Sequence, residues 1–313
     1  MANWMLQNSL SENMKTKFVY SFAEGTDYDK GLLGAKGATL SNMFKLKIPI
    51  PPGYSYYHYN YHYHYHYYIT YMLGFIITTE VCNDFIKNKW HSFPKDHGLI
   101  KEYTQKLYEL ERVTGRQFGG LKCSKQKKNR RLPLLLSIRT AATYPNPTRG
   151  LMSSILNVGI NDEITEELSI EMNNGKFAYQ CYYRFVRQFG INIIGVNTDI
   201  LDSIYNKTIN KGKKLQGNSA DMVNIAESID YLSRADLILL IKESKAAISL
   251  ISPFPDDPFV QLLMCIEEGF RSTAHPWATQ YRQLHNLPEN ISIIIQSMVF
   301  GNVNSRSGTG IMW

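Results

Sequence analysis

Two continuous apolar runs, LPLLLSIRT at 132–140 and ISIIIQSMVFG at 291–301, most constrain what this chain can fold into. Each run has the length of a buried strand, and the first is expected to end at Arg139. A third segment, KFVYSF at 17–22, alternates and predicts another strand. Apolar residues at helical spacing predict helices over 31–46, 78–86, 99–115, 175–190 and 255–274. Strands and helices mix without strict βα alternation, so the sequence predicts an α+β fold and not a doubly wound sheet.

Composition indicates a globular protein that binds no nucleic acid. The 313 residues are 44% hydrophobic and 19% charged, which allows a sizeable core. Much of the net charge of +7 lies in KCSKQKKNRR at 122–131. No aromatic residue interleaves with these charges to stack on bases, so a solvated loop is favoured. The polar segment NKTINKGKKLQGNSA at 206–220 is also predicted to be a loop.

The four cysteines indicate reduced thiols in a cytoplasmic protein. They are far apart and form no CxxC pair, so the sequence predicts neither a zinc site nor a disulfide framework. They are Cys82, Cys123, Cys181 and Cys265. The first residues carry no secretory signal, and the apolar run YYITYMLGFII at 67–77 is too short to span a bilayer. No membrane role is therefore predicted.

The segment GLLGAKGATL, which contains Lys36, is the first candidate for binding chemistry. Early glycines followed by helical spacing predict a tight turn that opens a helix, with Lys36 at its mouth. Glycines admit an anion close to the backbone, a helix N-terminus favours negative charge, and lysine adds a point charge. This suits a nucleotide phosphate, although the spacing is not that of a P-loop. A plain glycine turn with a surface lysine is the alternative.

Further candidates lie beside the predicted strands. Arg139 would be aimed at a cleft from the end of its strand, to contact phosphate or to form a salt bridge at the sheet edge. Gly150 with Ser153 and Ser154 predicts a helix start that offers donors to a ligand, or an ordinary N-cap. Gln296 is a polar residue in an apolar strand, and its amide could meet an adenine edge or a backbone carbonyl.

Read in order, the local motifs closely resemble the N-terminal part of pyruvate, phosphate dikinase, from about Phe18 to Gly310. They include GLLGAKGATLSNM, KIPIPPG, TGRQFGG, LPLLLSIRTAA, SSILNVGIND, DPFVQLLMCIEEGFRS and QSMVFGNVNSRSGTG. The resemblance implies an ATP-grasp-like nucleotide-binding domain over 17–313, after an extension at 1–16. It places Lys36 and Arg139 on the ATP phosphates and Gly150 and Ser154 beside the nucleotide. Gln296 falls on the strand that passes the adenine.

The same resemblance implies a kinase (phosphotransferase) in which ATP phosphorylates a histidine carrier and pyruvate becomes phosphoenolpyruvate. In the family, the Mg²⁺ ligands lie past the SGTG turn, and the phosphocarrier histidine and the pyruvate-binding barrel lie later still. The chain stops at Trp313 directly after a glycine turn, which suggests truncation. We therefore expect an incomplete ATP-binding domain that is inactive alone, with no metal site. The full-length family is expected to form homodimers.

Two departures from the family pattern support an alternative. Thr140-Ala141-Ala142 stands where the family has Ser-Gly-Ala, and Thr148-Arg149-Gly150 replaces Met-Pro-Gly. An added arginine and a lost glycine could reshape a loop that relies on close backbone approach to phosphate. The alternative is a decayed or repurposed, non-catalytic nucleotide-binding or regulatory fragment.

A tract rich in tyrosine and histidine occupies 54–74 and interrupts one motif of this resemblance. Its removal joins KIPIPPG to FIITTEVCNDF, with an ambiguous joint because either Gly53 or Gly74 can be kept. Three histidines, at 62, 64 and 66, would share one face of a strand and could chelate Zn²⁺ or Ni²⁺. No cysteine or carboxylate completes that set. We therefore interpret the tract as a low-complexity insertion that arose from a translated repeat or intron.

Overall fold

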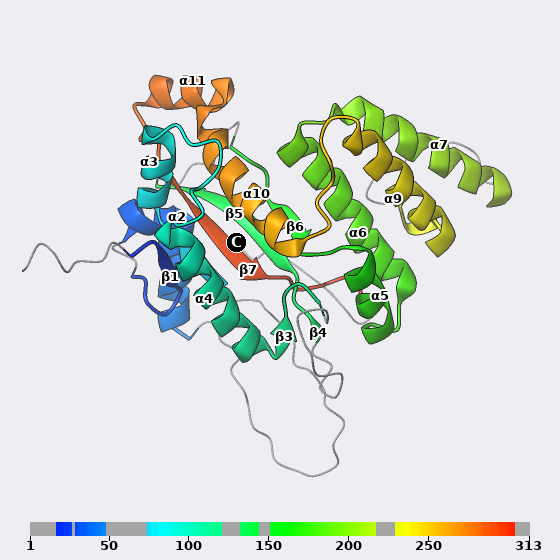
Figure 1. Cartoon of the computed structure of the whole chain (residues 1–313), viewed down its shortest axis with the longest axis horizontal. Coiled ribbons are helices and arrows are strands. Elements are labelled where there is room, and N and C mark those ends of the chain that lie inside the picture. Colours follow the sequence, from blue (N-terminus) through cyan, green and yellow to red (C-terminus); the bar gives the residue numbers. More distant parts are fainter. Residues whose placement is uncertain are drawn as a thin grey trace, which may run out of the picture.

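The computed structural model describes residues 17–26, 29–47, 74–120, 132–143, 151–216 and 229–303. Its centre is a five-stranded antiparallel sheet in the order β1-β2-β7-β5-β6 (Figure 1). The strands are β1 (Val19–Ser21), β2 (Gly74–Ile77), β5 (Leu136–Ala142), β6 (Ile155–Val158) and β7 (Ile291–Ser297). Helices and an antiparallel sheet are thus combined in one fold, as expected for the α+β class.

The first apolar run does not form the single strand that its sequence predicts. Leu132–Pro133 forms β4, which pairs in parallel with β3 (Arg116–Gln117), and β5 begins only at Leu136. The prediction that the strand ends at Arg139 is wrong, because β5 continues to Ala142. Its last residues stay paired with β7, where Ala142 lies opposite Ile291. Arg139 therefore lies in the middle of a strand.

Most predicted helices are present. The longer helices are α2 (Lys30–Lys45), α3 (Thr79–Lys87), α4 (Gly98–Thr114), α5 (Asp162–Glu171), α6 (Gly175–Phe189), α7 (Thr198–Gln216), α9 (Arg234–Ser249), α10 (Pro258–Arg271) and α11 (Pro276–His285). Short helical turns lie at Gly190–Ile194, Ile229–Tyr231 and Ser272–Ala274. Thr78 is the N-cap residue of α3, and Gly115 ends α4 at a positive φ of 67°. Both residue types are favoured at these positions of a helix.

Two predictions about helices are wrong. The segment 206–216 continues α7 and is not a loop, because Leu201, Tyr205 and Ile209 are buried at helical spacing and anchor it. On α10, helical spacing predicts a packed face of Val260, Leu263, Ile266 and Phe270. Ile266 and Phe270 are buried, as predicted, whereas Val260 is 44% exposed and Leu263 is only partly buried. Leu262 and Cys265 are buried beside them.

The two faces of the sheet are covered differently. Ile293 and Ile295 of β7 face the main hydrophobic core, which also receives buried residues of α3, α4, α6 and α10. Ile294 points to the opposite face, where a small cluster with Phe22, Leu33 and Ile76 packs under α2. Helices α5, α6, α7 and α9 gather beside β6 (Figure 1). Among the described helices, α2 packs on the sheet residues of this small cluster, and the candidate site lies on this face.

At both edges of the sheet, a side chain accepts hydrogen bonds from backbone N–H groups. Glu102 accepts hydrogen bonds from the backbone N–H groups of Phe18 and Val19 at 2.8 and 3.0 Å. Beside β6, Gln188 accepts from the N–H of Leu156 at 3.1 Å. Edges satisfied in this way offer fewer free donors to another strand. Across the described ranges, no helix combines the length and the apolar character needed to cross a bilayer.

Candidate nucleotide-binding site

Helix α2 contains a sharp break at Gly34. The backbone there has φ 71° and ψ 161°, a combination that is essentially restricted to glycine. A Cβ atom at this position would lie 2.7 Å from the carbonyl oxygen of Ala141 and 2.6 Å from Oγ of Ser292. The predicted glycine turn is therefore present, but it interrupts a helix that already begins at Lys30. Lys36 lies in the first turn after the break.

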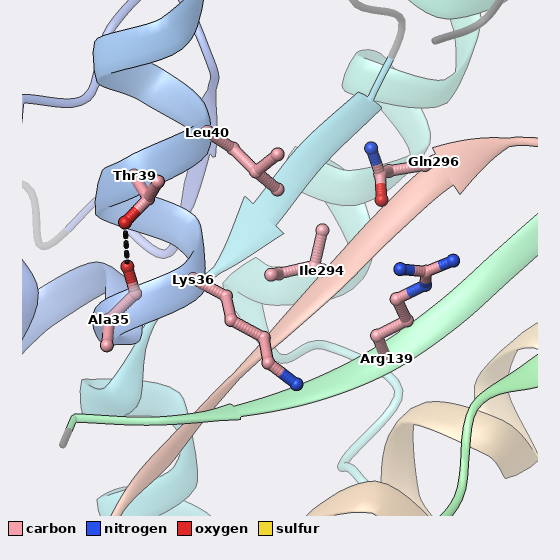
Figure 2. Close-up of a pocket in the computed structure, with 7 residues that line it drawn as sticks. All are labelled: Ala35, Lys36, Thr39, Leu40, Arg139, Ile294 and Gln296. Atoms are coloured by element: carbon pink, nitrogen blue, oxygen red, sulfur yellow. Dashed lines mark hydrogen bonds between the residues drawn. The ribbon is translucent and has the colours of Figure 1, made fainter. Parts of the chain in front are cut away.

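A pocket of about 340 Å³ lies between this turn and the sheet (Figure 2). Its lining comes from α2, β5 and β7, and consists of Ala35, Lys36, Thr39, Leu40, Arg139, Ile294 and Gln296. Arg139 and Ile294 are direct cross-strand partners, and Gln296 is two residues further along β7 on the same face. Three of the candidate residues, which are far apart in the sequence, therefore meet at one pocket.

Among the described residues that line the pocket, the charged ones are both cations. Lys36 and Arg139 are both exposed, and neither forms an ion pair or hydrogen bond with another described residue. The part of the lining that the structure describes contains no carboxylate. Two cations beside one cavity repel each other, and a bound anion relieves that repulsion. Guanidinium can also bind a phosphate through two parallel hydrogen bonds. The pocket thus has the charge and the donors to hold a phosphate group.

Gln296 adds a neutral polar group to the pocket. Its side chain is partly exposed, and its amide forms no hydrogen bond within the described parts of the chain. In Figure 2 the amide lies on the same side of the sheet as the guanidinium of Arg139. Leu40 and Ile294 provide apolar surface nearby. An amide beside apolar side chains can contact the polar edge and the flat face of a base.

Ser154 is not brought into this pocket by the described structure. Ser154 is exposed, precedes β6 and does not line the pocket. The helix start predicted after Gly150 is wrong, because Ile155–Val158 forms a strand in which Ile155 pairs with Ile138 of β5. Gly150 itself lies outside the described residues. The segments 122–131 and 54–73, and the SGTG turn, also lie outside them.

Four lining residues were not singled out from the sequence. Thr39 and Leu40 follow Lys36 at positions i+3 and i+4, so helical periodicity could have placed them on the face of Lys36. Thr39 donates a hydrogen bond from Oγ1 to the carbonyl oxygen of Ala35 at 2.9 Å. Ile294 precedes Gln296 by two residues and therefore shares its face of the strand. Ala35 had no signal beyond its place in the glycine turn.

Within the described ranges there is no group of three or more histidine, cysteine, aspartate or glutamate residues that could hold a metal ion. The pocket itself offers lysine, arginine, an amide and a hydroxyl, and these residues do not form a ligand set for Mg²⁺.

Fold and site together define an α+β domain with a cationic pocket on one face of its antiparallel sheet. Comparison with known proteins is consistent with this class. The chain is 34% identical over 297 residues to the pyruvate, phosphate dikinase of Entamoeba histolytica, which covers 94% of the chain and 28% of that protein. It is 32% identical to the dikinase of Rhizobium meliloti over 303 residues, 94% of the chain and 28% of that protein.

The dikinase of Giardia intestinalis is 31% identical over 307 residues, 95% of the chain and 30% of that protein. No family model matches the chain. The resemblance to pyruvate, phosphate dikinases is therefore confirmed over nearly the whole chain. The chain spans little more than a quarter of the length of these relatives.

Proposed function

We propose that the pocket between α2 and the sheet binds the phosphates of ATP. The observation that carries this proposal is the meeting of Lys36 and Arg139, two cations without an ion-pair partner among the described residues, at one pocket. Gln296 would contact the adenine, with Leu40 and Ile294 beside it. The domain would be of the ATP-grasp-like type that the dikinase resemblance implies.

The charges set the expected strength of the phosphate contacts. A hydrogen bond to a charged group contributes about 1.5–3 kcal/mol. Lysine acts as a point charge and arginine as a planar fork, so the two side chains can hold different phosphate oxygens. Removal of either side chain should therefore weaken ATP binding by about 10- to 100-fold, since about 1.4 kcal/mol corresponds to a factor of ten.

We further propose that the chain is the N-terminal, ATP-binding part of a dikinase-type phosphotransferase. The relatives that support this carry the name pyruvate, phosphate dikinase. In the whole protein, ATP bound here would phosphorylate a histidine carrier on the way from pyruvate to phosphoenolpyruvate. A cytoplasmic homodimer is the proposed setting. Mg²⁺ would be needed for transfer, and its ligands would come from residues other than the pocket lining.

The direct test is calorimetric titration of ATP into the 313-residue chain, with and without Mg²⁺. Lys36→Ala should weaken binding by about 10- to 100-fold through loss of the phosphate contact. Lys45→Ala is the matched control, because Lys45 is an exposed lysine on the last turn of the same helix and does not line the pocket. Equal affinities of the unaltered chain and Lys36→Ala would remove Lys36 from the site.

A second assay addresses activity of the chain alone. Because the resemblance places the Mg²⁺ ligands, the phosphocarrier histidine and the pyruvate site in other parts of the family, we propose that these 313 residues bind ATP without forming phosphoenolpyruvate. Formation of phosphoenolpyruvate from pyruvate, ATP and phosphate by the purified chain would contradict this. Absence of any ATP binding would instead favour the non-catalytic alternative.

A further inference from the structure

Ser292 is a buried hydroxyl in the middle of the sheet, directly beneath the break in α2. It lies on β7, opposite Ala141 of β5, and has no exposed surface. Its Oγ donates a hydrogen bond to the carbonyl oxygen of Leu33 at 2.5 Å. The carbonyl oxygen of Ala141 is a second acceptor at 3.4 Å. Ser292 does not line the pocket, so any effect on a ligand must act through other residues.

The break at Gly34 explains why a hydroxyl is needed there. A backbone angle outside the helical range interrupts the regular pattern of hydrogen bonds, so carbonyl groups just before the break need other donors. Two such carbonyls receive side-chain hydroxyls from different elements. Oγ1 of Thr79 donates to the carbonyl oxygen of Gly31 at 2.8 Å, and Ser292 donates to that of Leu33. These two hydrogen bonds connect the segment before the break to α3 and to the sheet.

Ser292 also contacts the break from the side of Gly34. Its Oγ lies 2.6 Å from the place where a Cβ atom of residue 34 would be. The serine therefore fills the space that the missing side chain leaves and holds the carbonyl next to it. Lys36 follows this fixed point by only two residues, whereas Arg139 belongs to the strand that pairs with Ser292's own strand.

From these contacts we infer that Ser292 is a positioning residue for nucleotide binding, which holds the Gly34 break so that Lys36 faces Arg139 across the pocket. The inference rests on the proposed ATP site. The Ser292 hydroxyl contacts no ligand itself. It fixes the start of the second part of α2 relative to β5 and β7, and thereby fixes the direction from which Lys36 enters the pocket.

The test compares Ser292→Ala with Ser272→Ala in the full 313-residue chain, at a temperature where both variants are folded. Ser272 is a matched control, because it is a buried serine whose Oγ donates to the carbonyl oxygen of Gly269 at 2.6 Å, at the end of α10. Both changes remove one buried hydrogen bond. Ser292→Ala should weaken ATP binding by about fivefold or more, as expected for coupled neighbours, and Ser272→Ala should leave it unchanged.

The same substitution in two further backgrounds separates positioning from general loosening of the fold. In Lys36→Ala, Ser292→Ala should have no further effect on ATP affinity, because the lysine that it positions is absent. In Arg139→Ala it should keep its effect. Ser292→Thr, which retains the hydroxyl, should restore most of the affinity. If Ser292→Ala does not fold, Ser292→Cys replaces it, since a thiol is only a weak donor.

The measured affinities distinguish failure of the Ser292 role from failure of the ATP site itself. If Lys36→Ala weakens ATP binding but Ser292→Ala does not, or if Ser292→Ala weakens it equally in the presence and absence of Lys36, the positioning role is wrong and the ATP site stands. If ATP binds with the same affinity to the unaltered chain and to Lys36→Ala, the proposed site is wrong, and the role of Ser292 is refuted with it.

Discussion

Gly34→Ala adds a single methyl group, yet the structure predicts that it strongly destabilises the protein. The new methyl group would force a residue with φ 71° and ψ 161° out of a region reserved for glycine, which costs about 1–3 kcal/mol. It would also overlap the carbonyl oxygen of Ala141, at 2.7 Å, in a buried position. Overpacking of this kind adds about 1–3 kcal/mol. We therefore expect a loss of at least about 2 kcal/mol of unfolding free energy.

Thermal unfolding followed by circular dichroism measures this loss, which should lower Tm by about 4 °C or more. Two controls isolate its causes. Gly31 lies in the same helix with open space around it, so Gly31→Ala should stabilise the protein by up to about 1 kcal/mol. Gly195 has φ 82° and nothing within 4 Å of a new Cβ, so Gly195→Ala should cost only the backbone strain. A Tm of Gly34→Ala equal to that of Gly31→Ala would refute the reasoning.

Three other predictions follow from burial and from the insertion. Burial raises the pKa of Glu171 to about 7, although Arg116 lies 4.0 Å away. Its contribution to stability should be complete below about pH 4.5 and lost as the pH rises through about 7, and urea titrations should show this pH dependence flattened in Glu171→Gln. Burial also raises the pKa of the Cys82 and Cys181 thiols to about 12, and it raises that of Cys265. These three thiols should resist a thiol reagent until the protein is unfolded, and rapid labelling of the native protein at these positions would contradict the structure. Deletion of 54–74 puts Gly53 in the place of Gly74. A glycine is needed there, because a side chain would collide with the carbonyl oxygen of Ile295, so the shortened chain should fold with equal or higher Tm and solubility. Failure to fold would show that the tract is structural.

The sequence was sufficient for features that depend on neighbouring residues. The helix ranges 78–86, 99–115 and 255–274 follow from local signals. In the structure, Thr78, Gly115 and Asp257-Pro258 lie at the ends of these helices. Local patterns singled out Lys36, Arg139 and Gln296, and the resemblance to the dikinases implied a role for each of them. The structure adds that these three residues line one pocket. Whether they bind ATP stays a prediction.

Features that depend on tertiary packing could not be predicted from the local sequence pattern. The length of β5 past Arg139 is set by its pairing with β7 and not by its own apolar residues. The polar surface of α7 predicted a loop, although buried side chains on one face, among them Leu201, Tyr205 and Ile209, hold that helix against its neighbours. The hydrogen bond from Ser292 to the carbonyl oxygen of Leu33, just before the break at Gly34, could not be predicted from sequence either, because the two residues are 259 positions apart.

The most direct test of the ATP site is the dissociation constant of ATP for the unaltered chain and for the Lys36→Ala/Arg139→Ala double variant, measured in one buffer at fixed salt. Loss of both phosphate contacts should weaken ATP binding by at least about 100-fold, while adenosine, which has no phosphate, should bind equally to both proteins. Equal ATP affinity of the two proteins would contradict the assignment of this pocket.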